Sequence, residues 1–142
     1  KFDAVFLNGN SDNLEEIENQ IYNINPKIEI FKTFYEVTNI QQFNLNFKYL
    51  IYSRIGNPSD FKNILLKNKF KISKEIIFSD HYEYQLNDFK KIQNIAKSEN
   101  LKIITTEKDY MKVPDQFKKE INYLTIDLVI ENENKLKDLL NN

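Results

Sequence analysis

The chain has one histidine, His81, which stands next to Asp80 in a polar segment at residues 79–84. An apolar run precedes this segment and a helical pattern follows it, so we expect the pair between a strand and a helix. A carboxylate beside an imidazole can orient the ring and tune its proton affinity, as proton transfer requires. The alternative is a solvated surface residue, which a single histidine in a loop usually is.

A second polar cluster occupies the same kind of junction one strand later and contains Thr106, Glu107, Lys108 and Asp109. Ligands of α/β proteins bind at the carboxyl ends of strands, so this cluster and the histidine segment could face one cleft. The cluster can equally be a capping box, with Thr106 at the N-cap and Asp109 at the N3 position of a helix. The sequence leaves both interpretations open.

A third junction, at residues 53–58, contains Gly56 and Asn57. Asn57 is a favourable N-cap and Pro58 suits the first helical position, so a helix is expected to begin here.

The elements that would position these junctions alternate along the chain. Runs typical of strands occur at residues 4–7, 28–37, 47–52, 70–78, 103–104 and 123–130. Patterns with helical spacing follow at residues 14–24, 58–65, 86–99 and 136–140. This order predicts a single α/β domain, residues 1–142, folded as a three-layer sandwich around a mostly parallel sheet. The three junctions then lie at the carboxyl ends of strands.

The composition predicts a folded domain and excludes several kinds of site. Hydrophobic residues make up 41% and the formal net charge is −1, so a core is expected and a nucleic-acid-binding surface is not. With no cysteine and one histidine, thiolate and histidine-rich metal sites are excluded. Neither glycine, Gly9 nor Gly56, belongs to a P-loop or a GxGxxG motif, so the chain contains no phosphate cradle.

No apolar run approaches the ~20 residues needed to span a membrane, and no secretory signal is visible. The chain begins at Lys1 without methionine and enters a strand-like run almost at once. We therefore expect it to be a piece of a longer protein.

In their order and spacing, the three junctions resemble the C-terminal half of the tetraacyldisaccharide 4′-kinase (lipid A 4′-kinase) family. The family's Gly-Ile-Gly-x-Pro-like segment resembles residues 53–58, its Phe-x-Asp-His segment resembles residues 78–84, and its Thr-Thr-Glu-Lys-Asp segment is matched in full at residues 105–109. Arg54 departs from the family, which usually has a small residue there. Tyr82 replaces a second histidine, and Gln85 is a poorer cap than the usual serine or threonine.

The resemblance implies a Rossmann-like second domain of a P-loop kinase. Members of the family use ATP and Mg²⁺ to phosphorylate the 4′-hydroxyl of a tetraacyldisaccharide 1-phosphate lipid in lipid A biosynthesis. They work at the cytoplasmic face of the inner membrane of Gram-negative bacteria. Their Walker A loop lies in an N-terminal P-loop domain, and no such loop occurs in this chain. That domain would bind most of the nucleotide and the Mg²⁺, and membrane contact is expected through the missing portion.

The resemblance also implies roles for single residues. His81 would be the catalytic residue that this domain brings in when it closes the cleft, where it pairs with an aspartate of the P-loop domain that deprotonates the sugar hydroxyl. Asp80 would help to form the site. The substrate or nucleotide cleft would be lined by Thr106, Glu107, Lys108, Asp109, Gly56 and Asn57.

We expect the chain to be inactive as a kinase by itself. One alternative is a non-catalytic α/β interaction module, whose polar strand ends would be only caps and turns. Another is a metal-dependent phosphoesterase built on Asp80 and His81, although such sites need several histidine and aspartate ligands.

Overall fold

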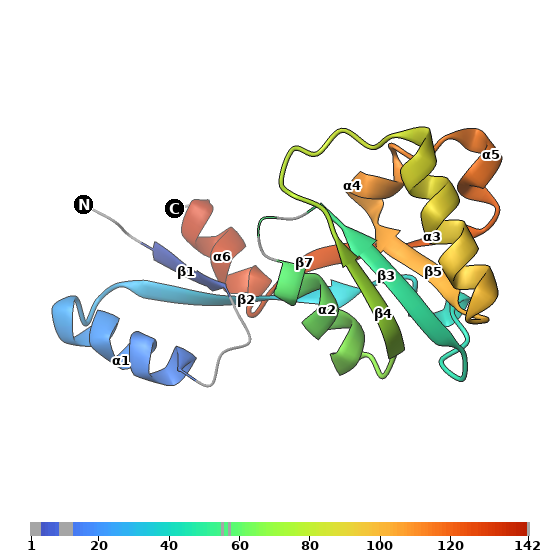
Figure 1. Ribbon diagram of the computed structural model, residues 1–142. Coiled ribbons are helices and arrows are strands. Elements are labelled where there is room, and N and C mark those ends of the chain that lie inside the picture. The colour runs from blue at the N-terminus through green and yellow to red at the C-terminus, as the bar shows by residue number, and fades with distance from the viewer. Residues whose placement is uncertain (1–3, 9–12, 55, 57, 142) are drawn as a thin grey trace. The chain divides into compact units, whose positions relative to one another are not determined.

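The computed structural model describes residues 4–8, 13–54, 56 and 58–141 of the chain. The chain forms two compact units (Figure 1). Unit 1 comprises Lys1–Glu36 and Asp127–Asn142, and unit 2 comprises Val37–Ile126. Unit 2 is therefore inserted between two sequence segments of unit 1, a division that the sequence did not indicate.

Unit 2 contains a four-stranded sheet in the order β4-β3-β5-β6, in which every neighbouring pair is parallel. Parallel neighbours need crossover connections, and helices supply them here. The strands are β3 (Lys48–Ser53), β4 (Lys71–Ile77), β5 (Lys102–Thr106) and β6 (Ile121–Leu124). The connecting helices are α2 (Pro58–Lys67), α3 (Leu86–Ser98), α4 (Glu107–Tyr110) and α5 (Asp115–Lys118), and a 3₁₀ turn, η1 (Ile40–Gln42), precedes β3.

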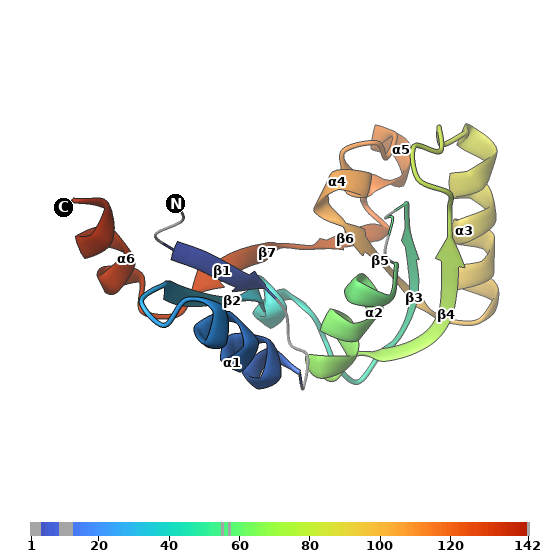
Figure 2. The ribbon, with the colours of Figure 1, turned by 90° about the vertical axis from the view of Figure 1, so that its left-hand side faces the viewer.

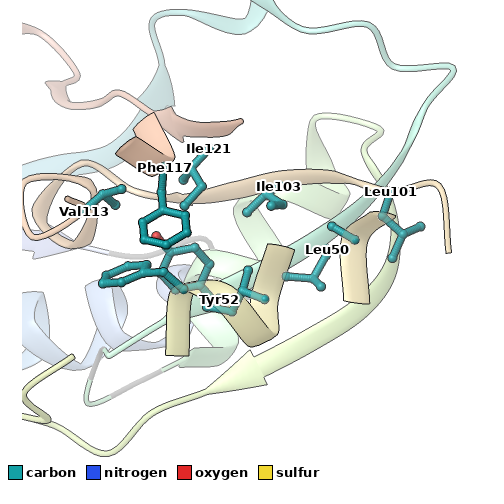
Figure 3. Packing of buried hydrophobic residues seen from close by; sticks show 10 residues of the cluster. Leu50, Tyr52, Leu101, Ile103, Val113, Phe117 and Ile121 are labelled. Atoms are coloured by element: carbon teal, nitrogen blue, oxygen red, sulfur yellow. The ribbon is translucent and has the colours of Figure 1, made fainter. Parts of the chain in front are cut away.

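Helices cover both faces of this sheet. Side chains alternate along a strand, so successive residues of the buried strand β3 face opposite layers. Leu50 and Tyr52 belong to one core cluster, and Tyr49 and Ile51 belong to the other. The first cluster, seen from close by in Figure 3, also holds α3 and α5 residues, namely Phe89, Ile92, Ala96 and Phe117. The second holds Phe61 and Leu65 of α2. Figure 2 shows α2 and α3 on opposite sides of the sheet.

Unit 1 is built around a three-stranded sheet in the order β1-β2-β7, in which β1 and β2 are parallel. Its elements are β1 (Ala4–Asn8), α1 (Leu14–Ile24), β2 (Glu29–Val37), β7 (Ile126–Ile130) and α6 (Glu133–Leu140). Two ion pairs connect its helices to β2: Lys32 lies 2.7 Å from Glu18 of α1, and Lys135 of α6 lies 2.5 Å from Glu29.

The predicted α/β class, with a parallel sheet between helical layers, is confirmed. The single late strand predicted at residues 123–130 is instead two strands in different sheets. Thr125 lies between them: its N donates to Asn39 Oδ1 (3.0 Å) and its O accepts from the N of Thr38 (3.0 Å). Because these bonds engage the backbone between the strands, β6 ends at Leu124 and the chain resumes as β7.

Candidate functional site

The three polar junctions lie at the carboxyl edge of the unit 2 sheet. Strands β4, β3 and β5 are parallel neighbours, so their carboxyl ends meet at one edge. Figure 2 shows α4 and the segment after β4 at this same end. Two links join the junctions directly, because Phe78 N donates to Ser53 O (2.9 Å) and Arg54 hydrogen-bonds to both Asp109 and Tyr82.

His81 stands in a turn after β4, closed by a hydrogen bond from Tyr82 N to Ser79 O (3.0 Å). Its φ of 62° places it in the left-handed region, which non-glycine residues rarely adopt. Asp80 Oδ1 accepts from His81 N (3.1 Å), which stabilises the turn locally. The imidazole itself is 91% exposed, and its Nε2 lies 3.5 Å from Asp80 Oδ2, longer than an ordinary hydrogen bond. The ring is therefore presented to solvent and only weakly held by Asp80.

Thr106 and Asp109 form the helix cap that the sequence offered as an alternative. Thr106 Oγ1 accepts from Asp109 N (3.1 Å) at the start of α4, and its hydroxyl lies 3.0 Å from Asp109 Oδ2. Asp109 is 1% exposed, so its carboxylate makes contacts inside the fold and not with solvent. Glu107 and Lys108 of the same helix are exposed. Of this cluster, only these two present whole side chains to solvent.

Arg54 is a site residue that the sequence analysis noted only as a departure from the family and did not include among the predicted site residues. Its N donates to Asp109 Oδ2 (3.0 Å), its Nε to Asp109 Oδ1 (2.9 Å) and its Nη1 to Tyr82 O (2.5 Å). The hydrogen bond to Asp109 raises the pKa of the guanidinium, which stays charged. One signal was available: Arg54 is the only arginine in a chain rich in lysine. Arginine is the residue suited to planar, multidentate pairing with a carboxylate.

An aromatic cluster packs against this ion pair and supports the histidine turn. The guanidinium carbon of Arg54 lies 4.9 Å from the centre of the Tyr84 ring. Tyr84 contacts the rings of Phe78, Tyr82 and Tyr52 at centroid distances of 4.9, 5.9 and 5.8 Å. Tyr82 also donates from its hydroxyl to Asp88 Oδ2 (3.0 Å).

Asp88 also completes the start of α3. Its Oδ2 accepts from the N of Gln85 (2.8 Å), so the carboxylate at the N3 position satisfies a backbone donor at the helix start. The amino end of α3 is therefore capped by Asp88, although Gln85 is a poor capping residue.

The first junction is described only in part. Gly56 is exposed, and a Cβ placed on it would lie 3.9 Å from Asp80 Oδ2, an ordinary contact distance. Gly56 therefore lies beside the histidine turn, although the available space does not demand a glycine. Asn57, which we predicted to line the cleft, lies outside the described residues.

The described residues do not form a site for the phosphates or the metal that the resemblance requires. Among residues 4–8, 13–54, 56 and 58–141, no group of three or more histidine, cysteine, aspartate or glutamate side chains is placed to hold a metal ion. The chain's two glycines form no phosphate-binding loop. A cavity of about 620 Å³ opens at the opposite, amino edge of the sheet, beside Tyr49 and Lys102, and none of the predicted site residues lines it.

No helix within the described part of the chain is long and apolar enough to cross a bilayer.

Comparison with known proteins finds one family. The whole chain, residues 1–142, matches the family described as Tetraacyldisaccharide-1-P 4'-kinase (LpxK). It is 42% identical over 139 residues to the tetraacyldisaccharide 4'-kinase of Pelagibacter ubique, an alignment that covers 98% of this chain and 44% of that protein. It is 33% identical over 134 residues to the enzyme of the same name from Rickettsia bellii, with 94% and 40% covered. The chain thus spans less than half the length of these relatives.

A solved structure shares the fold. The crystal structure of LpxK from Aquifex aeolicus in complex with ATP superposes with a TM-score of 0.54 at 19% sequence identity, covering 98% of this chain and 51% of that one.

Proposed function

Because the chain belongs to the tetraacyldisaccharide-1-P 4'-kinase family, we propose that it is the C-terminal portion of an ATP-dependent lipid A 4′-kinase. The intact protein transfers the γ-phosphoryl group of ATP to the 4′-hydroxyl of a tetraacylated glucosamine disaccharide. In this proposal, the reaction takes place at the cytoplasmic face of the inner membrane. Membrane contact belongs to the portion of the protein outside this chain.

The proposal divides the work between two parts of the protein. An N-terminal P-loop domain binds the phosphates and Mg²⁺, since the described residues of this chain offer neither a metal-ligand cluster nor a phosphate loop. This chain closes the cleft with the carboxyl edge of its parallel sheet. Phosphoryl transfer depends mainly on positioning and on charge stabilisation, so the contribution asked of this chain is a correctly placed side chain.

His81 is that side chain, and the observation that carries the proposal is its exposed ring in an anchored, left-handed turn. The imidazole is 91% exposed, in a turn whose flanking residues are hydrogen-bonded to the end of β3 and, through Arg54, to Asp109 after β5. A histidine that acts on a second domain must reach out of its own, and the left-handed backbone of His81 (φ 62°) distinguishes it from a solvated loop residue, which needs no such strained conformation. In the closed protein, His81 orients a carboxylate of the P-loop domain, which accepts the proton of the 4′-hydroxyl.

The test is His81→Ala in the intact protein, assayed with ATP, Mg²⁺ and tetraacyldisaccharide 1-phosphate. Loss of a residue that supports proton transfer should lower kcat by about 10²–10⁴-fold. Glu83→Gln is the matched control, because Glu83 is an exposed residue of the same segment and its backbone carbonyl, which the substitution keeps, accepts from Gln85 Nε2 (3.0 Å). It should retain normal turnover. Wild-type turnover in folded His81→Ala would remove His81 from the mechanism.

A further inference from the structure

The contacts of Arg54 connect the histidine turn to the end of β5. On one side, its N and Nε hold both oxygens of Asp109, and on the other its Nη1 holds the carbonyl of Tyr82, the residue after His81. The side chains of Arg54 and Asp109 are 9% and 2% exposed. A guanidinium at this depth, with the chain's own acceptors on it, is placed to hold the fold together rather than to bind substrate.

The segment on either side of His81 is held at both ends. Before it, Phe78 N donates to Ser53 O (2.9 Å), which fixes the segment to the end of β3. After it, the carbonyl of Tyr82 is bound by Arg54 and the hydroxyl of Tyr82 by Asp88. Only Ser79, Asp80 and His81 lie between these anchors. The left-handed conformation of His81 is unfavourable by itself, so it persists only where the surroundings determine it.

We propose that Arg54 is a positioning residue for His81, and that the Asp109–Arg54–Tyr82 clamp sets the direction in which the imidazole leaves the sheet edge. The clamp consists of the Asp109 carboxylate, the Arg54 guanidinium and the Tyr82 carbonyl. This inference rests on the proposed function, because the clamp affects catalysis only if His81 takes part in the reaction. It needs arginine, since a lysine ammonium lacks the planar fork that reaches a carboxylate and a carbonyl at once.

The experiment is a double-mutant cycle in the intact protein, with Arg54→Lys, His81→Ala and the double variant. A residue that acts only through another loses its effect when the other is removed. We expect Arg54→Lys to lower kcat by up to about 100-fold, the effect of a displacement of about 1 Å at a reacting group, without changing the KM for ATP. The double variant should have the same kcat as His81→Ala. Lys62→Gln, which removes the cation of the Lys62–Glu75 pair in unit 2, is the control and should behave as wild type.

The outcomes separate this inference from the proposed function. Normal turnover in His81→Ala would defeat both the catalytic role of His81 and the clamp, although the kinase assignment itself would stand. A low kcat in His81→Ala together with normal turnover in Arg54→Lys would overturn only the clamp. A raised KM for ATP in Arg54→Lys would show a direct contact with the nucleotide, and losses that multiply in the double variant would show that Arg54 acts independently of His81. Either result overturns the positioning role.

A second measurement does not depend on catalysis. Hydrogen exchange of the intact protein should show faster exchange at the amides of His81 and Tyr82 in Arg54→Lys, because these amides are hydrogen-bonded within the turn. The amides of α3 should exchange as in the wild type, which also checks that the variant is folded. Unchanged exchange in the turn would mean that Arg54 does not hold it.

Discussion

At the scale of single residues, two buried phenols lie close to the charged clamp. The hydroxyls of Tyr52 and Tyr84 have no hydrogen-bond partner within the described part of the chain. Burial raises the pKa of both phenols, and the negative charge of Asp109 raises it further. Both groups are thus held in their neutral form, which suits a site where one carboxylate is already paired with Arg54.

Tyr52 therefore makes the free energy of unfolding depend on pH in the alkaline range. The folded protein keeps the phenolic proton at a pH where the unfolded chain releases it, so the contribution is complete below about pH 10 and is lost as the pH rises toward the raised pKa. We expect the free energy of unfolding, measured with urea, to fall above about pH 10. Tyr52→Phe should reduce that slope by up to about 1.4 kcal/mol per pH unit. An identical slope in the two proteins would contradict this account.

The site could be predicted from the sequence only where residue type was informative by itself. His81 and the Thr106–Asp109 cap were found because one histidine and one threonine-led acidic turn stand at strand ends. The position of Arg54 was noted, but its partner is 55 residues away in the chain, and no local pattern connects them. Burial could not be predicted either: Asp109 is enclosed and His81 exposed, although both are polar residues in similar junctions.

At the scale of elements, Asn39 joins the two sequence ends of unit 2. Its Nδ2 donates to Tyr123 O (2.9 Å) and its Oδ1 accepts from Thr125 N (3.0 Å), while its side chain is largely buried. This amide replaces the ladder bonds that β6 would otherwise continue. The hydrogen bonds of the Asn39 side chain therefore fix the boundary between β6 and β7.

Asn39→Ala should destabilise the protein. Its removal leaves the backbone groups of Tyr123 and Thr125 without these partners, which costs about 1–3 kcal/mol for each buried group left unsatisfied. Urea unfolding measures the loss. Gln42→Ala is the control, because its amide only approaches Asn39 Nδ2 at 3.5 Å, and it should change stability little. Equal stability of the two variants would show that Asn39 is not required.

Elements with clear periodicity were predictable, and those set by distant contacts were not. The helical spacing of α3 and the strand-like run of β3 are local patterns, and both elements occur where they were predicted, at Leu86–Ser98 and Lys48–Ser53. The run at residues 123–130 contains no glycine or proline to mark a break, and its division depends on Asn39, more than 80 residues earlier. The four-residue α5 was also missed, because it is too short to show a period.

At the scale of the whole molecule, the proposal assigns a catalytic side chain to one edge of this chain and nucleotide binding to another domain. The parallel sheet of unit 2 presents His81, whereas phosphate-binding loops of kinases require closely spaced glycines and a lysine. The chain has two glycines in 142 residues, and its described part has no cluster of metal ligands. A chain that positions a side chain but does not bind the phosphates cannot stabilise the charge that develops on the phosphoryl oxygens in the transition state.

The 142 residues alone should therefore transfer no phosphate. Purified chain, shown to be folded by circular dichroism, is incubated with ATP, Mg²⁺ and tetraacyldisaccharide 1-phosphate, and product is followed by transfer of radiolabelled γ-phosphate. The intact protein under the same conditions is the positive control. Intact His81→Ala, with its lowered kcat, is a low-rate reference that the assay must resolve from background. We expect label only with the intact protein, because in the proposed division of labour the P-loop domain places the γ-phosphoryl group. Phosphorylated lipid formed by the folded 142-residue chain would mean that it binds nucleotide through residues other than a P-loop, and the division of labour proposed above would be wrong.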